Sequence, residues 1–320
     1  MSKVLCFAIA DLDYLDIIKV GLYTYSLHNN QPIKVFVEDG TAEVFRKEIP
    51  LACVEFINYD LSKTKCNGFY KDHKDLFSST YYFWKKDHIL NMLSANEILD
   101  ELIAKYKNNY DVIIRLDLDV LFYDDITKTV DDFIKSNCVI GSIVEAVSSE
   151  TKIDIPGIDY LNAGSLFFRM NHPNLLANHT ERMLAYIEKA KRIFYFPDQD
   201  TLNLMYAHAD KFKLNNRGWI VGIYSPDGIK RLSENTVFVH YAGFGKPYQI
   251  VNAKAHPLRA TYKTYLEAAK LAHCSTEFIN TICQCIQSLQ APTENYAANT
   301  ILFNVFFRTR NKTKCIISHL

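Results

Sequence analysis

The chain has no long apolar run and no recognisable targeting segment. None of its 320 residues belongs to a stretch that approaches the ~18 consecutive apolar residues of a membrane-spanning helix. The opening run Val4–Ala10 is apolar but short, and it meets Asp11 and Asp13 without a small-residue cleavage site. We therefore expect a first buried strand at this position and a cytoplasmic protein.

The sequence also has no excess of charge of either sign and no paired cysteine motif. Lys plus Arg and Asp plus Glu each number 36, so the formal net charge is zero and gives no general electrostatic reason to bind nucleic acid. The eight cysteines form no C-x-x-C pair. In a cytoplasmic chain they are expected to be reduced thiols rather than disulfides. No internal repeat or low-complexity linker divides the sequence.

Apolar and aromatic residues, by contrast, are plentiful. Hydrophobic residues make up 48% of the chain, with 20 Tyr and 20 Phe, enough to bury the core of one large α/β domain with appendages or of two modest domains. The first 37 residues have the order strand, helix, strand, which predicts a parallel sheet with right-handed crossovers. Ligands bind beyond the carboxyl ends of such strands, where Asp11 and Asp13 lie. The alternative is that these two aspartates cap the following helix.

Hydrophobic periodicity predicts the remaining elements. Strands are expected at 33–37, 54–57, 110–114, 138–144, 160–170 and 238–240, and helices at 15–27, 81–90, 96–105, 130–134 and 175–192. The stretch 196–206 is expected to be a polar turn that opens another helix. The lysine-rich stretch 61–79 is expected to be a polar loop or a surface insertion. Helical patterns at 260–272 and 277–289 then divide the chain into a catalytic domain at 1–250 and a C-terminal helical extension at 251–320.

The C-terminal tail is apolar first and basic afterwards. Residues 301–307 are mostly hydrophobic, and Arg308, Arg310, Lys312 and Lys314 follow without an acidic residue. This order is typical of a peripheral membrane contact. A last helix that packs on the core and ends in basic residues explains it equally well.

The strand at 110–114 leads into a pair of carboxylates, Asp117 and Asp119. Side chains two positions apart in extended chain point to the same side, so the pair can converge on one point. Two close carboxylates repel each other unless a cation lies between them, and Mg²⁺ or Mn²⁺ is a suitable cation for oxygen ligands. The alternative is that both aspartates are solvated or cap a helix.

Four separated regions together resemble glycosyltransferase family 8, whose members have the GT-A fold and transfer sugars with retention of anomeric configuration. The regions are Ala10-Asp11-Leu12-Asp13-Tyr14, Leu116-Asp117-Leu118-Asp119-Val120, Tyr160-Leu161-Asn162-Ala163-Gly164, and Asp198-Gln199-Asp200-Thr201-Leu202-Asn203 together with His240-Tyr241-Ala242-Gly243-Phe244-Gly245-Lys246-Pro247. Each motif alone is weak, but the ordered set across about residues 3–250 is specific. The resemblance implies an α/β fold with a mixed, mostly parallel sheet flanked by helices.

The resemblance also implies a ligand set for the metal and the nucleotide. Asp117 and Asp119 match the metal ligands, and His240 completes the protein's share of the shell around Mn²⁺ or Mg²⁺. The ion would bridge the diphosphate of a UDP-sugar. The remaining nucleotide-binding matches are Asp11, Asp13 and Tyr14 for the uracil and its ribose, and Gly243 and Lys246 for the diphosphate loop. Ala10 and Leu118 are further expected donor-binding positions.

Further matches concern the transferred sugar. Asn162 and Ala163 match positions that line the donor cleft, and Asp198 and Gln199 match positions that face the sugar. A double displacement with retention needs a carboxylate on the far face of the sugar, whereas Gln199 is a poor nucleophile. We therefore favour same-face substitution, in which the leaving phosphate helps to deprotonate the acceptor. Asp200 is the alternative nucleophile.

The chain departs from the family pattern at two places. Family members commonly have a donor-binding arginine in the helix near residues 82–86, where this chain offers Lys85 or Lys86 as a point charge. The donor-sugar loop near Glu145 gives no clear match. These departures leave the identity of the sugar open.

The sequence thus predicts a hexosyltransferase with a nucleotide-sugar donor and a saccharide, glycolipid or glycoprotein acceptor, with no nucleic acid partner. A role in polysaccharide synthesis rests only on the basic tail, and a homodimer remains open. The alternatives are an aspartate-nucleophile phosphohydrolase, whose D-x-D also follows an apolar strand, and an inactive glycan-binding relative. The phosphohydrolase motif usually lies in the first strand, and it gives Asn162 and His240 no role.

Overall fold

A computed structural model describes residues 2–78, 86–145, 157–214, 218–220, 235–242, 246–248 and 259–288. Contacts between residues group the chain into two units. The first unit takes in 1–10, 30–117 and 126–215, and the second takes in 11–29, 118–125 and 216–320. The chain therefore passes from the first unit to the second between Asp117 and Leu118, inside the D-x-D motif.

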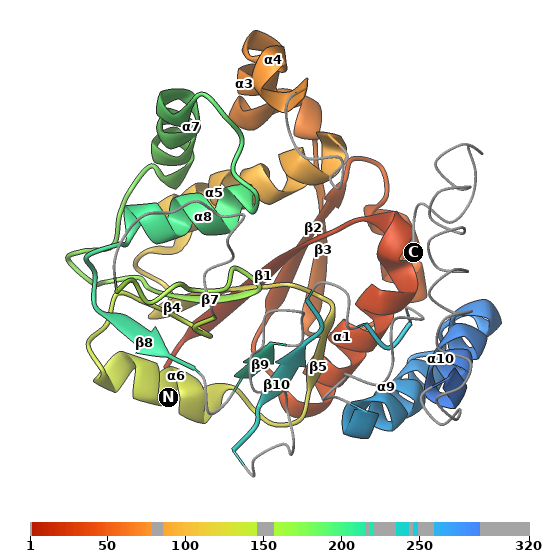
Figure 1. Cartoon of the computed structure of the whole chain (residues 1–320). Coiled ribbons are helices and arrows are strands. Elements are labelled where there is room, and N and C mark those ends of the chain that lie inside the picture. Colours follow the sequence, from red (N-terminus) through yellow and green to blue (C-terminus); the bar gives the residue numbers. More distant parts are fainter. Residues whose placement is uncertain are drawn as a thin grey trace. The chain divides into compact units, whose positions relative to one another are not determined.

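The first unit is built on a seven-stranded sheet in the order β3-β2-β1-β4-β7-β6-β8 (Figure 1). The strands are β1 (Val4–Ala10), β2 (Ile33–Glu38), β3 (Val54–Tyr59), β4 (Val112–Leu116), β6 (Ile140–Ser142), β7 (Ser165–Arg169) and β8 (Lys211–Lys213). Every neighbouring pair is parallel except those that include β7, which is antiparallel to β4 and β6. The predicted mixed, mostly parallel α/β sheet is confirmed.

The order of the strands reverses at β1. This strand pairs with β2 on one side, with Cys6 opposite Ile33, and with β4 on the other, with Val4 opposite Val112. Because β1 and β4 are parallel neighbours, their carboxyl ends at Ala10 and Leu116 lie at the same edge of the sheet. Ligands bind at such a switch point in open α/β sheets.

Helices cover both faces of this sheet. They are α2 (Ala42–Glu48), α3 (Lys65–Asp72), α4 (Lys74–Ser78), α5 (Lys86–Tyr106), α6 (Thr127–Lys135), α7 (His179–Ala190) and α8 (Pro197–Met205), with the 3-10 turn η2 (Leu61–Lys63). Helices α5 and α8 lie side by side over one face (Figure 1), and Phe168 of β7 belongs to their core. The next residue back, Phe167, contacts Phe133 of α6 with ring centroids 5.8 Å apart, because successive strand residues point to opposite faces.

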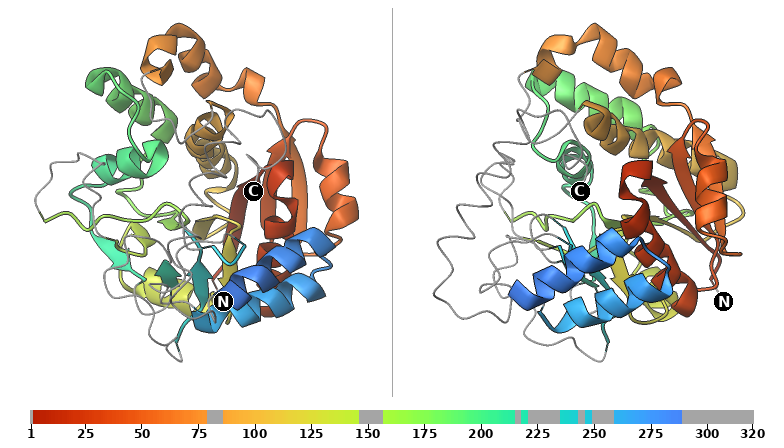
Figure 2. Two further views of the ribbon diagram at one scale, coloured as in Figure 1. Left: turned by 45° about the vertical axis from the view of Figure 1, so that its right-hand side comes forward. Right: turned by 90° about the vertical axis from the view of Figure 1, so that its right-hand side faces the viewer.

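The second unit joins segments from three parts of the chain. It contains η1 (Leu12–Tyr14), α1 (Leu15–His28), β5 (Val120–Phe122), β9 (Gly218–Ile220), β10 (Phe238–His240), α9 (Arg259–Leu271) and α10 (Thr276–Ser288). Strand β10 pairs antiparallel with β5 and parallel with β9. Helices α9 and α10 pack against each other (Figure 2), and α9 packs on α1. Their shared core buries Val20, Leu121, Tyr241, Tyr265 and Phe278.

The structure corrects two predictions about local structure. The stretch 61–79 is not a polar loop, because 61–78 forms η2, α3 and α4. Thr64 caps α3 by accepting a hydrogen bond from the Asn67 N–H at 3.0 Å, and Cys66 is fully buried. The predicted helices at 81–90 and 96–105 are one helix from Lys86 onward, since no Gly or Pro interrupts residues 91–95; residues 79–85 lie outside the described residues.

Three further predictions concern the C-terminal part of the chain and its relation to a membrane. The division at residue 250 stays a prediction. The apolar and basic tail lies outside the described residues. Among the helices that the structure describes, none combines the length and the apolar character needed to cross a membrane.

Candidate active site

The D-x-D motif begins where β4 ends. Asp117 directly follows Leu116, and its backbone N–H donates to the Gly164 carbonyl at 2.7 Å. The Asp119 carbonyl accepts a hydrogen bond from the Tyr241 N–H at 2.9 Å. Backbone hydrogen bonds therefore hold both aspartates in place. Asp117 is bonded to Gly164, the residue before β7, and Asp119 is bonded to Tyr241, the residue after β10.

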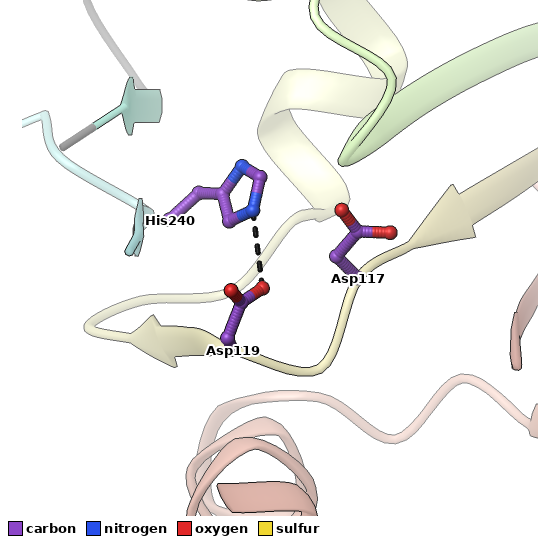
Figure 3. A group of neighbouring side chains, drawn as sticks. All are labelled: Asp117, Asp119 and His240. Atoms are coloured by element: carbon purple, nitrogen blue, oxygen red, sulfur yellow. Dashed lines mark ion pairs between the residues drawn. The ribbon is translucent and has the colours of Figure 1, made fainter. Parts of the chain in front are cut away.

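His240 meets the acidic pair through the register of β10 on β5. Their antiparallel pairing places His240 opposite Val120, the neighbour of Asp119. The imidazole Nε2 lies 3.1 Å from Asp119 Oδ1, and the His240 side chain is 4% exposed. One ligand atom from each of Asp117, Asp119 and His240 lies within 4.8 Å of the other two, and Figure 3 shows the three side chains converging. The predicted proximity of these residues is present.

The donor set of this cluster fits a divalent ion. Two carboxylate oxygens and one imidazole nitrogen are ligands that Mn²⁺ accepts readily and Mg²⁺ accepts in part. Ligation by Nε2 requires that nitrogen to be unprotonated. Asp117, Asp119 and His240 would thus hold the ion, and its identity stays a prediction.

Lys246 completes the charge balance around Asp119. Its Nζ lies 2.5 Å from Asp119 Oδ2 and 5.9 Å from the centre of the Tyr248 ring. Burial alone would raise the pKa of Asp119, but the charges and hydrogen bonds of Lys246 and His240 outweigh it and hold this pKa well below its usual range. Asp119 is therefore a carboxylate at any physiological pH. Gly243, predicted to act beside Lys246, lies outside the described residues.

The segment after β1 combines a cap with an exposed aromatic residue. Asp11 is the N-cap of η1, and its side chain accepts from the Asp13 N–H at 3.0 Å; Asp11 therefore caps this turn, and its role in nucleotide binding stays a prediction. Ala10 is buried, whereas Tyr14 is 37% exposed. Burial raises the pKa of Tyr14 and the ammonium of Lys246 opposes the rise. Tyr14 is thus within electrostatic reach of Lys246.

In the first unit, Gln199 is locked by hydrogen bonds on both ends of its amide. Its Oε1 accepts from the Ala163 N–H at 2.8 Å and from Asn162 Nδ2 at 3.2 Å. Its Nε2 donates to Glu145 Oε1 at 2.5 Å. A backbone N–H can only donate and a carboxylate accepts, so this orientation of the amide is the consistent one. The structure thus brings Asn162, Ala163 and Gln199 together as predicted.

The two aspartates beside Gln199 have different surroundings. Asp198 accepts a hydrogen bond from the Arg115 guanidinium at 2.5 Å. Asp200 is completely buried, and its oxygens accept from the Tyr160 hydroxyl and from the Phe196 N–H. Burial, the largest cause, raises the pKa of Asp200 to about 7. Asp198 is thus paired with a cation, whereas Asp200 is buried among neutral hydrogen-bond donors.

Sequence reasoning missed three residues that build this site. Arg115 lies in β4 and reaches Asp198, with Asp117 at 4.0 Å. Glu145 holds Gln199, and Asn203 ties α8 to the 160–163 segment, since its amide donates to the Leu161 and Gln199 carbonyls and accepts from the Leu161 N–H. For Arg115 the sequence did contain a signal: it is a charged residue in an otherwise apolar strand, and such a residue needs a partner when it is buried. Lys85 lies outside the described residues.

Much of this site lies in a segment that matches a known protein family. Residues 101–250 match the family model described as Glycosyl transferase family 8. This segment, just under half of the chain, is thus similar to family 8 glycosyltransferases. The predicted family resemblance and the predicted enzyme class, a glycosyltransferase, are confirmed. No curated protein matches the chain significantly.

Solved structures share the fold of this chain. The galactosyltransferase LgtC, in complex with donor and acceptor sugar analogues, is 17% identical with a TM-score of 0.58, and the match covers 87% of this chain and 99% of LgtC. The bifunctional glycosyltransferase WbbM is 14% identical with a TM-score of 0.56 over 89% and 52% of the two chains. GlyE of Streptococcus pneumoniae is 13% identical with a TM-score of 0.52 over 92% and 66%.

Proposed function

We propose that the chain is a metal-dependent, retaining hexosyltransferase that moves a hexose from a UDP-sugar to a saccharide or glycoconjugate acceptor. The observation that carries the proposal is the meeting of Asp117, Asp119 and His240 within 4.8 Å in a segment that matches family 8. Isolated D-x-D pairs are common, but a buried histidine from a distant strand joined to one is not expected by chance. A bound divalent ion would supply positive charge where the leaving diphosphate gains negative charge.

The chain's own residues would bind and orient the nucleotide. Lys246 offers a cation that can hold a phosphate oxygen, and it already lies beside Asp119 at 2.5 Å. Tyr14, exposed by 37%, offers an aromatic face for uracil. Asp11 and Asp13 remain proposed ligands of the uridine, Gly243 remains a proposed contact of the diphosphate, and Lys85 remains a proposed contact of the donor.

The hydrogen bonds of Gln199 support same-face substitution. Both Oε1 lone pairs are engaged by Ala163 and Asn162, so this oxygen is poorly disposed to attack an anomeric carbon. The buried Asp200 is not exposed to a substrate either. An LgtC structure, 17% identical over 92% of this chain and 99% of LgtC with a TM-score of 0.54, contains an active-site glutamine-to-glutamate mutation. We propose that Gln199 and Asp198 face the sugar and position it, while the leaving phosphate receives the acceptor proton.

The acceptor class is proposed more broadly. LgtC was solved with a donor and an acceptor sugar analogue, which supports a saccharide acceptor here. A glycolipid or polysaccharide acceptor, a cytoplasmic location and a membrane contact of the tail remain proposals from the sequence.

The proposal is tested by replacing the cluster one ligand at a time. Asp119→Ala and His240→Ala are each expected to reduce Mn²⁺-dependent UDP release from UDP-hexoses by ~100-fold or more, because the ion loses a direct ligand. Asp39→Ala, which removes an exposed carboxylate of the first unit, is the matched control and should release UDP like the wild type. UDP release is measured across a panel of UDP-hexoses, with and without a chelator.

Two results would overturn the proposal. One is full activity of either ligand variant, or of the wild type in chelator. The other is hydrolysis of simple phosphomonoesters with no turnover of any UDP-sugar, which would favour the phosphohydrolase instead.

A further inference from the structure

Helix α1 touches the D-x-D motif through a glycine. A Cβ atom built on Gly21 would lie 2.3 Å from the Leu118 carbonyl oxygen and 3.2 Å from its carbonyl carbon. Leu118 is the residue between the two aspartates, and both atoms belong to the backbone. A larger residue at position 21 therefore cannot be accommodated by rotation of a side chain, and the motif itself would have to move.

Thr24 lies one turn farther along the same face of α1 and contacts the other end of the segment. Its Oγ1 accepts a hydrogen bond from the Phe122 N–H at 3.2 Å, while the hydroxyl donates within the helix to the Val20 carbonyl at 3.0 Å. The rings of Tyr25 and Phe122 meet edge to face with centroids 5.2 Å apart. Helix α1 thus holds residues 118 and 122, and Asp119 lies between them.

The helix is a firm support for this segment. Val20 is fully buried in the core that also contains Leu121 and Tyr241, and Tyr241 donates to the Asp119 carbonyl. A glycine inside a helix costs about 1 kcal/mol relative to alanine, so Gly21 weakens α1 itself. Because Gly21 has no side chain, the backbone of the D-x-D motif at Leu118 can approach α1 closely.

We propose that Gly21 and Thr24 are positioning residues that set the place of Asp119 in the metal cluster, an inference that rests on the proposed function. Neither residue touches the ligand atoms, so each acts through the backbone of 118–122. Ordinary contacts of a Cβ atom lie beyond 3.4 Å, so a methyl group at position 21 would push the loop by a sizeable fraction of an ångström. Ligand distances in metal sites tolerate only about 0.2 Å.

The test measures Mn²⁺ binding without nucleotide, by isothermal titration calorimetry, together with urea unfolding. Gly21→Ala is expected to weaken Mn²⁺ binding by ~10-fold or more. The matched control is Gly68→Ala in α3, where a Cβ meets nothing within 4 Å, and it should bind Mn²⁺ like the wild type. A purely structural role for Gly21 would lower stability and leave the Mn²⁺ dissociation constant unchanged.

A second pair of variants decides the question if Gly21→Ala does not fold. Thr24→Val removes the oxygen that accepts from Phe122 and should weaken Mn²⁺ binding, whereas Thr24→Ser keeps the oxygen and should restore it. Wild-type affinity in both Gly21→Ala and Thr24→Val, with no binding by Asp119→Ala, overturns the inference and leaves the proposed function standing. Absence of Mn²⁺ binding by the wild type overturns both.

Discussion

Asp119 and Asp200 show how strongly the surroundings of a carboxylate decide its chemistry. Burial opposes ionisation of both, but Asp119 has the ammonium of Lys246 and the imidazole of His240 beside it. Asp200 has mainly neutral donors, the Tyr160 hydroxyl and the Phe196 N–H. As a result the pKa of Asp119 is lowered, whereas burial raises that of Asp200 to about 7. At neutral pH Asp119 is therefore ionised, whereas Asp200 is still partly protonated.

The raised pKa of Asp200 predicts a pH-dependent stability. The folded protein keeps the proton up to about pH 7, against an ordinary value of 3.8, so the free energy of unfolding should fall as the pH rises between these values. Asp200→Asn cannot titrate, and its free energy of unfolding relative to the wild type should increase from pH 5 to pH 8 by on the order of 2 kcal/mol. Urea unfolding at the two pH values measures this difference. A difference that does not change with pH would show that Asp200 is ionised throughout.

Helix α7 depends on a neighbouring helix for its first turn. Asn178, its N-cap, has a φ of 60° and makes no side-chain cap bond. Asp100 of α5 takes over, accepting from the N–H groups of His179 and Thr180 at 2.8 and 2.9 Å and from both of their side chains. This explains why the helix predicted from residue 175 begins at His179: its cap comes from another element.

Removal of this cap should destabilise the first unit. Asp100→Ala leaves buried donors of His179 and Thr180 without their acceptor, which should cost about 2–4 kcal/mol of unfolding free energy. Burial alone would raise the pKa of Asp100, but the hydrogen bonds from His179 and Thr180 outweigh burial and hold this pKa below its ordinary value. The stabilisation is therefore present above about pH 4 and lost as the pH falls through the lowered pKa of the folded state.

Urea unfolding at pH 7 and at pH 3 measures both parts of this prediction. Glu101→Ala, an exposed carboxylate on the same helix, is the control and should change stability little. An Asp100→Ala protein as stable as the control at pH 7 would contradict the role of the cap.

At the scale of the whole molecule, the C-terminal helices share one core with the strands that carry the candidate ligands. Tyr265 and Phe278 of α9 and α10 lie in the same cluster as Leu121 of β5 and Tyr241 of β10. This shared core implies that a change in α9 or α10 also affects β5 and β10. The predicted C-terminal extension from residue 251 implies instead that these helices could be perturbed without effect on β5 and β10.

Two phenylalanine variants distinguish these expectations. Phe278→Ala should raise hydrogen exchange in β5 and β10, because loss of a buried Phe costs about 3–5 kcal/mol in its own core. Phe45→Ala, in a fully buried position of α2 that stacks on Phe56 of β3, should raise exchange in β2 and β3 instead. Hydrogen exchange by mass spectrometry reads both regions. Unchanged exchange of β5 and β10 in Phe278→Ala would support a separate extension.

The sequence by itself determined the sheet class, most of its strands and helices, and the D-x-D motif, because each depends on residues close together in the chain. Resemblance to a family added His240 and Lys246 as candidates. Only the tertiary structure decided that both of these meet Asp119, that Arg115 pairs with Asp198, and that Glu145 holds Gln199. These contacts follow from strand order and register, which bring distant residues together and leave no local pattern. The same is true of Gly21, whose importance comes from the backbone that packs against it.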